Sequence, residues 1–290
     1  MTLQTVAAAE PFVPPKARKE VARRAVFYAL MLVIAAIFFV PFLWTIMTSF
    51  KTIPDAVNVT SLPHPWTTSA WHTVWTQDHF PTYIKNSLFL AAVIVVCNIF
   101  LAGLGGYAFA RLRFPGRDLL FLLVLGTLMV PDQLRLIPIF VMMVNWGLYG
   151  HFESYILINL VTATNLFFMR QYFLTIPKDF EEAAKLDGAG YFKTFWRVML
   201  PLALPAMSAL IILQFQGTWN DFFWPLILFG QGDTSHYTIQ LGLAEYLFQY
   251  SSYVPQVMVG SILAIVPVLI IFLAFQRYFV SGVVSSGVKG

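Results

Sequence analysis

The apolar run 203–229 contains polar residues at helical spacing, namely Gln214, Gln216, Gly217, Asn220 and Asp221. Because these residues recur at intervals of three and four, we expect a polar sector on one side of a helix. Gln214, Asn220 and Asp221 could hydrogen-bond the hydroxyl groups of a solute, and Trp219 could stack on the face of a sugar ring. Alternatively, these groups satisfy one another or a partner helix.

A second group of polar residues lies between two prolines of another apolar run. Pro131 and Pro138 interrupt the hydrogen-bond ladder of a helix, and the residues between them include Asp132, Gln133 and Arg135. This pattern is typical of an interrupted helix that lines a cavity, which makes Asp132 and Gln133 further candidates for a solute pathway. Alternatively, the helix ends near Pro131 and the charges lie at the outer surface.

The sequence lacks the side-chain patterns of common hydrolytic and metal sites. It has no His-x-x-x-His, no Cys/His cluster and no Gly-x-Ser-x-Gly. Residues 188–194 resemble a phosphate-binding loop only superficially, because Phe192 replaces the second glycine. Three outer-loop histidines, His64, His72 and His79, suggest solvated side chains, with a metal site as the alternative. We expect no catalytic residue, bound cofactor or metal in this chain.

The composition indicates which elements must position these residues. Of the 290 residues, 58% are hydrophobic and only 11% are charged, whereas about a quarter of a soluble domain is charged. Apolar runs of about 20 residues are long enough to cross a bilayer. We therefore predict six spanning helices, at about 26–49, 86–110, 119–143, 152–173, 203–229 and 255–276. Ala102, Gly106 and Ala110 follow the small-xxx-small pattern that permits close helix contact.

The basic residues are distributed unevenly about these spans. Fifteen of the eighteen Lys and Arg residues lie in the head 1–25, after span 86–110, in or beside the segment 175–202, or in the tail 277–290. Because cytoplasmic segments carry the excess of positive charge, we expect both termini to be cytoplasmic. Membrane topology thus explains the uneven distribution of the basic residues, and nucleic-acid binding is disfavoured. The head, which contains several prolines, is expected to be disordered.

The segment 175–202 is a polar island that predicts two short helices. Acidic residues Asp179, Glu181 and Glu182 lie in the first turn of the first helix, where they favour the positive end of its dipole. Asp187 and Gly188 end that helix, because glycine readily adopts the left-handed conformation. The second helix is amphipathic, with an apolar face expected from Phe192, Phe195, Trp196 and Met199.

This island resembles the EAA loop of ABC-importer permeases. Glu182, Ala183, Ala184, Gly188, Leu200 and Pro201 have the spacing of that loop, with Val198 where the pattern usually has Ile. The runs 181–189, 218–226 and 287–290 are similar to the carbohydrate-importer, MalG-like branch. The resemblance covers roughly residues 25–290.

The resemblance implies an all-α polytopic membrane protein with the type I ABC-importer permease fold. The resemblance implies that the following residues contact the ATPase subunits: Glu181, Glu182, Ala183, Ala184, Asp187, Gly188, Ala189, Leu200 and Pro201. The implied partners are a second, similar permease subunit, two cytoplasmic ATPase subunits that hold ATP and Mg, an extracytoplasmic solute-binding protein, and the lipid bilayer. The implied location is the bacterial cytoplasmic (inner) membrane, and the implied cargo is a sugar or oligosaccharide.

Two other functions fit a polytopic chain. A secondary, ion-coupled transporter would need an internal repeat and an ion or proton site, and the sequence has no convincing repeat and few carboxylates within its apolar runs. A membrane anchor without transport activity is the third interpretation. The tail 277–290 is rich in Ser, Gly and Val, which is typical of disorder, whereas the resemblance implies that it reaches the ATPase subunits.

Overall fold

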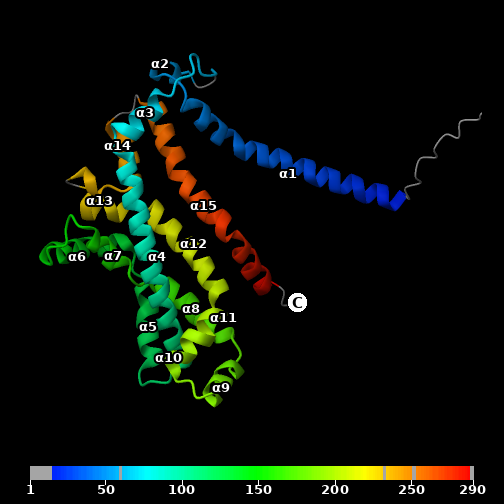
Figure 1. The fold of residues 1–290 in the computed structure, drawn as a ribbon, viewed down its shortest axis with the longest axis vertical. Helices are drawn as coiled ribbons and strands as arrows, with labels where there is room; N and C mark the ends of the chain where they lie inside the picture. The colour runs from blue at the N-terminus through cyan, green and yellow to red at the C-terminus, as the bar shows by residue number, and fades with distance from the viewer. Residues whose placement is uncertain (1–14, 59–60, 231–232, 250–252, 288–290) are drawn as a thin grey trace, which may run out of the picture.

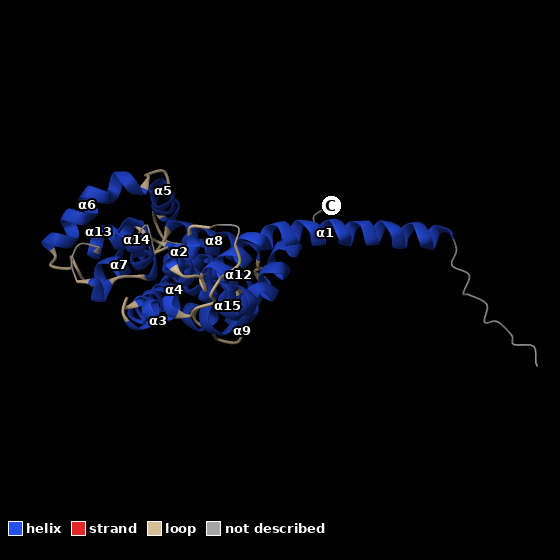
Figure 2. Cartoon of the chain, turned by 90° about the horizontal axis from the view of Figure 1, so that it is seen from above, coloured by secondary structure: helices blue, strands red, loops and turns tan. Residues whose placement is uncertain are grey.

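The computed structural model describes residues 15–58, 61–230, 233–249 and 253–287, and within these ranges every regular element is a helix (Figures 1 and 2). In chain order the elements are α1 (Pro15–Thr48), α2 (Ile53–Ala56), α3 (Ser69–Thr76), α4 (Phe80–Arg111), α5 (Arg117–Thr127), α6 (Asp132–Asn145), α7 (Phe152–Asn159), α8 (Ala163–Thr175), α9 (Asp179–Leu186), α10 (Tyr191–Thr194), the π-helix η1 (Phe195–Met199), α11 (Leu200–Leu202), α12 (Leu204–Asn220), α13 (Phe223–Phe229), the 3-10 helix η2 (Thr234–His236), α14 (Ile239–Gln249) and α15 (Val254–Gly287).

Helix α4 is the axis of the bundle. It runs from the end that carries α2, α3 and α14 to the end that carries α9 and α10, and α8 and α12 pack along it (Figure 1). The predicted close contact is confirmed, because Ala102, Gly106 and Ala110 are all buried. A Cβ on Gly106 would lie 2.6 Å from the Cβ of Met169 in α8. The absence of a side chain therefore sets the distance between the two backbones.

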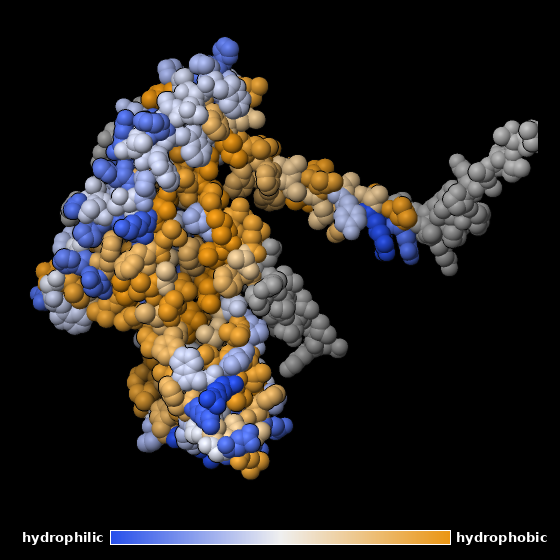
Figure 3. Space-filling view, viewed as in Figure 1, coloured by the Kyte–Doolittle hydropathy of each residue, from blue (hydrophilic) through white to orange (hydrophobic). Residues whose placement is uncertain are grey.

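Within the described residues, four helices are long and apolar enough to cross a membrane, and the number reaches the predicted six if each of two bent pairs is one span. Four are single segments, namely Lys19–Thr48, Phe80–Arg111, Phe152–Thr175 and Val254–Phe275. The other two are bent pairs, Arg117–Thr127 with Asp132–Asn145, bent by 99°, and Tyr191–Leu202 with Leu204–Asn220, bent by 74°. In Figure 3, hydrophobic residues cover much of the middle of the visible face, and hydrophilic ones gather along its upper left edge and at its lower end.

Two predicted boundaries differ from the structure. Residues 15–25, which we expected to be disordered, form the beginning of α1. Pro15 suits the first turn of a helix, and no glycine or proline follows until Pro41, so the backbone continues as a helix. At the other end, the apolar span ends at Phe275, near the predicted residue 276, but α15 continues as a helix to Gly287. Residues 1–14 and 288–290 of the predicted head and tail lie outside the described residues.

The predicted span 203–229 is not one continuous helix. α12 ends at Asn220, Asp221 has an extended backbone (φ −69°, ψ 121°), and α13 begins at Phe223. The Asp221 carboxylate accepts a hydrogen bond from the backbone N–H of Trp224 at 3.3 Å. An aspartate that caps a following helix in this way competes with continuation of the preceding helix, which explains the break.

Candidate functional site

A cavity of about 560 Å³ lies where three helix breaks meet. The breaks separate α5 from α6, α7 from α8, and α12 from α13. The lining comprises Thr127, Leu128, Val130, Pro131, Asp132, Arg135, Ile139, Tyr155, Ile158, Asn159, Val161, Thr162, Ala163, Thr164, Gln214, Gly217, Thr218, Asp221 and Trp224. Because a helix end leaves backbone N–H and C=O groups without intrahelical partners, the three breaks give this cavity a polar wall.

A chain of buried amides fixes Gln214 at the cavity. Asn98 of α4, which is fully buried, donates to the backbone oxygen of Asn159 at 2.8 Å. Asn165 of α8 donates to the side-chain oxygen of Asn98 and to that of Gln214, at 2.7 Å in each case. Gln214 in turn donates to the hydroxyl of Thr218 at 3.2 Å. The network positions Gln214 and also satisfies part of its hydrogen-bonding capacity.

Asp221 is held at the third break by two donors. The Tyr155 hydroxyl donates to one carboxylate oxygen of Asp221 at 2.9 Å, and the Trp224 N–H donates to the other. Both oxygens retain lone pairs, because each carboxylate oxygen can accept two hydrogen bonds. The carboxylate can therefore keep its structural bonds and still accept a bond from a hydroxyl group in the cavity.

The charged residues after Pro131 lie at the cavity, as expected for an interrupted helix that lines it. α6 runs at 99° to α5, and Asp132 and Arg135 both line the cavity. These two side chains form an ion pair with each other and are about half exposed. Gln133 is exposed and is not among the lining residues, because it points from another side of α6.

Trp219 does not lie at the cavity, so the prediction that it stacks on a solute is wrong for this structure. Its side chain is 1% exposed, and its indole N–H donates to the backbone oxygen of Ala264 in α15 at 2.8 Å. Its ring stacks on Phe215 with centroids 5.7 Å apart and an interplanar angle of 13°. Trp219 therefore links α12 to α15 through this hydrogen bond.

Asn220 and Gln216 lie on a different side of α12 from Gln214. They line a groove of about 470 Å³ between α12 and α15, where Gln240 donates to the Asn220 side-chain oxygen at 3.3 Å. The single polar sector predicted from the sequence is therefore wrong. At 100° per residue, positions 216 and 220 fall more than 90° from position 214, whereas position 221 falls close to it.

Several cavity residues were not singled out from the sequence. Asn159 and Tyr155 come from α7, Thr162 precedes α8, and Asn98 and Asn165 support them from α4 and α8. An asparagine inside an apolar run is a signal in itself, because polar groups at membrane depth are rare. Within the described residues, no group of three or more His, Cys, Asp or Glu could hold a metal ion.

The polar island 175–202 forms the two short helices that the sequence predicts. α9 begins at Asp179, and Gly188 beyond its end has φ +74°, in the left-handed region. A Cβ on Gly188 would meet no atom within 4 Å. Glycine is therefore required here by the backbone conformation and not by crowding.

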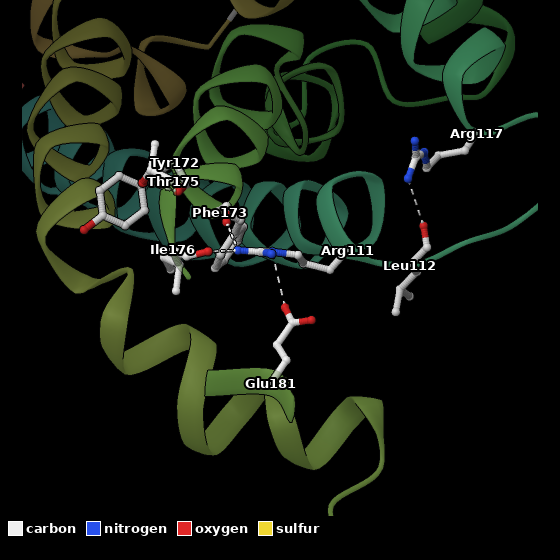
Figure 4. A network of polar contacts seen from close by, with 8 residues as sticks. All are labelled: Arg111, Leu112, Arg117, Tyr172, Phe173, Thr175, Ile176 and Glu181. Atoms are coloured by element: carbon white, nitrogen blue, oxygen red, sulfur yellow. Dashed lines mark hydrogen bonds and ion pairs between the residues drawn. The ribbon is translucent and has the colours of Figure 1, made fainter. Parts of the chain in front are cut away.

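Glu181 joins this island to the ends of two long helices. Its carboxylate forms an ion pair at 3.3 Å with Arg111 at the end of α4, and both side chains are nearly buried, at 12% and 5% exposed. Arg111 also donates to the backbone oxygens of Phe173 and Ile176 at the end of α8 (Figure 4). One guanidinium group thus connects α4, α8 and α9.

The other residues that were predicted to contact the ATPase subunits differ in how exposed they are. Glu182, Ala183, Asp187 and Gly188 are exposed, as is Pro201, whereas Ala189 and Leu200 are partly buried and Ala184 is buried. Leu186 is 90% exposed and Phe180 is 45% exposed. The exposed residues of α9 thus include two large apolar side chains, Phe180 and Leu186.

The predicted apolar face of the second helix is only half correct. Phe195 and Met199 are buried, but Phe192 and Trp196 are 68% and 43% exposed. The π-helix η1 spans Phe195–Met199 and has a wider turn than an α-helix, so the predicted α-helical spacing does not apply there.

Comparison with known proteins gives consistent matches. Residues 99–285 match the family model described as "Binding-protein-dependent transport system inner membrane component". The chain is 39% identical to the arabinooligosaccharides transport system permease protein AraQ of Halalkalibacterium halodurans, over 72% of this chain and 74% of that one. It is 34% identical to the diacetylchitobiose uptake system permease protein NgcG of Streptomyces coelicolor, over 91% and 88% of the respective chains.

Among solved structures, the fold is similar to that of a bacterial ABC transporter involved in the import of the acidic polysaccharide alginate. The TM-score is 0.77 with 24% sequence identity, and the match covers 93% of this chain and all of that one. The chain therefore shares its fold with that structure.

Proposed function

The chain belongs to the family of binding-protein-dependent transport system inner membrane components, and we propose that it forms half of the pathway of an ATP-driven importer for a sugar or oligosaccharide. The relatives named for arabinooligosaccharide and diacetylchitobiose uptake support this class of cargo. The observation that carries the proposal is the polar cavity at the three helix breaks. Its volume of about 560 Å³ and its mixed donors and acceptors suit a hydroxyl-rich solute.

In this proposal, Gln214 and Asp221 bind the solute from α12 and its break, and Asp132 binds it from α6. Each retains hydrogen-bonding capacity beyond the bonds it makes within the protein, since an amide or carboxylate oxygen accepts up to two bonds. Asn220 has its side chain in the groove beside α15 and is assigned instead to the surface that faces the second permease subunit.

The exposed surface of α1 supports the proposal that a second permease subunit is present. This helix projects away from the rest of the chain (Figure 2), and none of its most apolar 18-residue window is buried. Large side chains such as Phe38 and Phe39 are 70% and 61% exposed. Close packing against a similar subunit would cover part of this surface, with lipid covering the rest.

The energy source is assigned to two ATPase subunits, which hold ATP and Mg and dock on α9. The exposed side chains of Leu186 and Ala183 offer an apolar surface with acidic neighbours, Glu182 and Asp187. The ion pair between Glu181 and Arg111 supports mechanical coupling, because movement of α9 would carry the ends of α4 and α8 with it.

The remaining partner is an extracytoplasmic solute-binding protein, which would deliver the cargo at the end that carries α2 and α3. The opposite end gathers Arg111, Arg113 and Arg117 beside Lys178 and Lys185, and the positive-inside rule assigns that end to the cytoplasm. Both termini are then cytoplasmic, in the bacterial inner membrane.

The pathway is tested by comparing Gln214→Ala with Gln216→Ala. The two glutamines lie on the same helix, one at the cavity and one in the groove beside α15. In proteoliposomes that contain the complete transporter and its binding protein, we expect Gln214→Ala to reduce sugar uptake about 3- to 10-fold, the effect of one lost hydrogen bond. Gln216→Ala should leave uptake near the wild-type rate. Equal effects of the two substitutions would contradict the assignment of the cavity.

The secondary-transporter interpretation makes a different prediction. The purified chain alone should then move solute in liposomes under an ion gradient. We expect it to be inert until the second permease and the ATPase subunits are supplied. Family membership favours the outcome in which the isolated chain is inert.

A further inference from the structure

A second cavity, of about 810 Å³, lies between α9 and the loop that joins α4 to α5. Five cationic side chains line it, namely Arg111, Arg113, Arg117, Lys178 and Lys185. The only acidic side chains in its lining are Glu181 and Glu182. The cavity therefore concentrates positive charge contributed by two segments that are about 70 residues apart in the sequence.

Internal ion pairs neutralise only part of this charge. Arg111 is paired with Glu181, and Arg117 is paired with Asp118 at 3.0 Å. Within the described residues, no ion pair involves Arg113, Lys178 or Lys185. Glu182 is thus the only carboxylate left to balance three cations, and an anion of up to two charges would neutralise the remainder.

The basic cavity continues into an apolar surface. Arg113, Phe114 and Arg117 also line a smaller adjoining hollow, which extends to Leu119 at the beginning of α5. From there, the face of α5 carries leucines that are between 48% and 63% exposed, at positions 119, 120, 122 and 123. A molecule with a phosphate group and long apolar chains could occupy the cavity and the α5 surface together.

We propose that this cavity binds the phosphate headgroup of an anionic phospholipid of the cytoplasmic leaflet, with the acyl chains lying on α5. Guanidinium groups bind phosphate oxygens in a bidentate manner, and basic pockets at the cytoplasmic side of membrane proteins are typical headgroup sites. A soluble phosphate would use the same cations, but it would gain nothing from the exposed leucines. The bound lipid would join α9 to the α4–α5 loop and so stabilise the position of α9.

The inference is independent of the cargo and of ATP hydrolysis, and it uses the proposed orientation only to name the leaflet. The test is lipid binding to the delipidated transporter complex in detergent, measured by native mass spectrometry with phosphatidylglycerol and with phosphatidylcholine. The variant is Arg113→Gln with Lys178→Gln. The matched control is Lys193→Gln with Arg197→Gln, which removes two exposed charges near the same loop but outside the cavity.

We expect the wild-type complex to prefer phosphatidylglycerol, and the cavity variant to bind it roughly 10- to 30-fold more weakly, because each cation near a membrane surface contributes about a factor of five. The control should bind like the wild type, and both variants should elute as intact complexes. Soluble glycerol phosphate at millimolar concentration should not displace the lipid.

Three outcomes would overturn the proposal. Equal binding of phosphatidylglycerol and phosphatidylcholine would show that the site does not recognise an anionic headgroup. An equal loss of binding in the control variant would show that binding does not depend on this cavity. Displacement of the lipid by glycerol phosphate would assign the cations to a soluble anion instead. None of these outcomes would affect the proposed transport function, which is measured by uptake.

Discussion

Gly188 and Gly190 are two residues apart in the same loop and differ in backbone conformation. Gly188 has φ +74°, whereas Gly190 has φ −73°, and a Cβ on either would meet no atom within 4 Å. We expect Gly188→Val to strain the turn after α9 by about 1–2 kcal/mol, because L-residues disfavour the left-handed region. Sugar uptake and binding-protein-stimulated ATP hydrolysis should both fall, with membrane insertion intact. Gly190→Val serves as the control, and unchanged coupling in Gly188→Val would refute the assignment of this loop.

Glu181 and Glu182 form a similar pair of neighbours with different surroundings. Glu181 is buried against Arg111, and Glu182 is exposed. We expect Glu181→Gln to destabilise the docking of α9 by about 3 kcal/mol, because it leaves the Arg111 charge without its carboxylate. Hydrogen exchange of the α9 amides in the assembled complex should accelerate accordingly. For Glu182→Gln, a change within about 0.5 kcal/mol is expected, as for most exposed positions. Similar exchange rates in both variants would count against a buried coupling link.

Sequence reasoning at this scale succeeded where the signal is local and failed where it depends on a distant partner. The conformation of Gly188 follows from its place after a short helix. The burial of Glu181 does not, because its partner Arg111 is 70 positions earlier in the chain. The direction of Trp219 depends on where α15 lies, and only the tertiary structure supplies that. The division between Gln214 and Gln216 was available from helical geometry alone.

At the scale of elements, the contact between α4 and α8 depends on one missing side chain. A Cβ on Gly106 would lie 2.6 Å from the Cβ of Met169 and 2.8 Å from the backbone nitrogen of Arg170, neither of which can move without shifting α8. Gly106→Ala is therefore expected to lower stability by about 1–3 kcal/mol through overpacking. The measurement is the thermal midpoint of the purified complex.

Gly126 in α5 provides the matched control for Gly106, because a Cβ there would meet no atom within 4 Å. Gly126→Ala should leave the midpoint unchanged or raise it slightly, since alanine is the better helix former. If Gly106→Ala matched this control, α4 and α8 would not be packed as described.

The number of spanning segments and the two-helix island were predictable, because hydrophobic length and helix-end signals are local. The break at Asp221 was not, because Asp221 fits the helical spacing of the polar residues before it, which assigns it to one continuous helix. What decides the break is the bond from the Trp224 N–H to the Asp221 carboxylate together with the bond from the Tyr155 hydroxyl. The second of these comes from another helix.

At the scale of the whole molecule, α1 is the element least explained by the chain itself. Replacing each of Ile37, Phe38, Phe39 and Val40 with a photo-crosslinking residue would sample a full turn of this exposed helix. We expect crosslinks to the second permease subunit from one face of the turn, because a partner covers only one side of a helix. The same probe at Leu122 of α5 should crosslink to lipid. The absence of any subunit crosslink from α1 would contradict its role in assembly.

The proposed transport cavity lies at three helix breaks, where helix ends leave main-chain N–H and C=O groups without partners in their own helices. Substitution can exchange the side chain of Gln214 or Asp221, but every residue keeps its backbone carbonyl group, and only a change to proline removes a backbone N–H group. In the proposed pathway, a general affinity for hydroxyl-rich molecules would come with the fold, and a few side chains would discriminate among such molecules. In evolutionary terms, descendants of such a chain can change cargo by a handful of substitutions without rebuilding the pore.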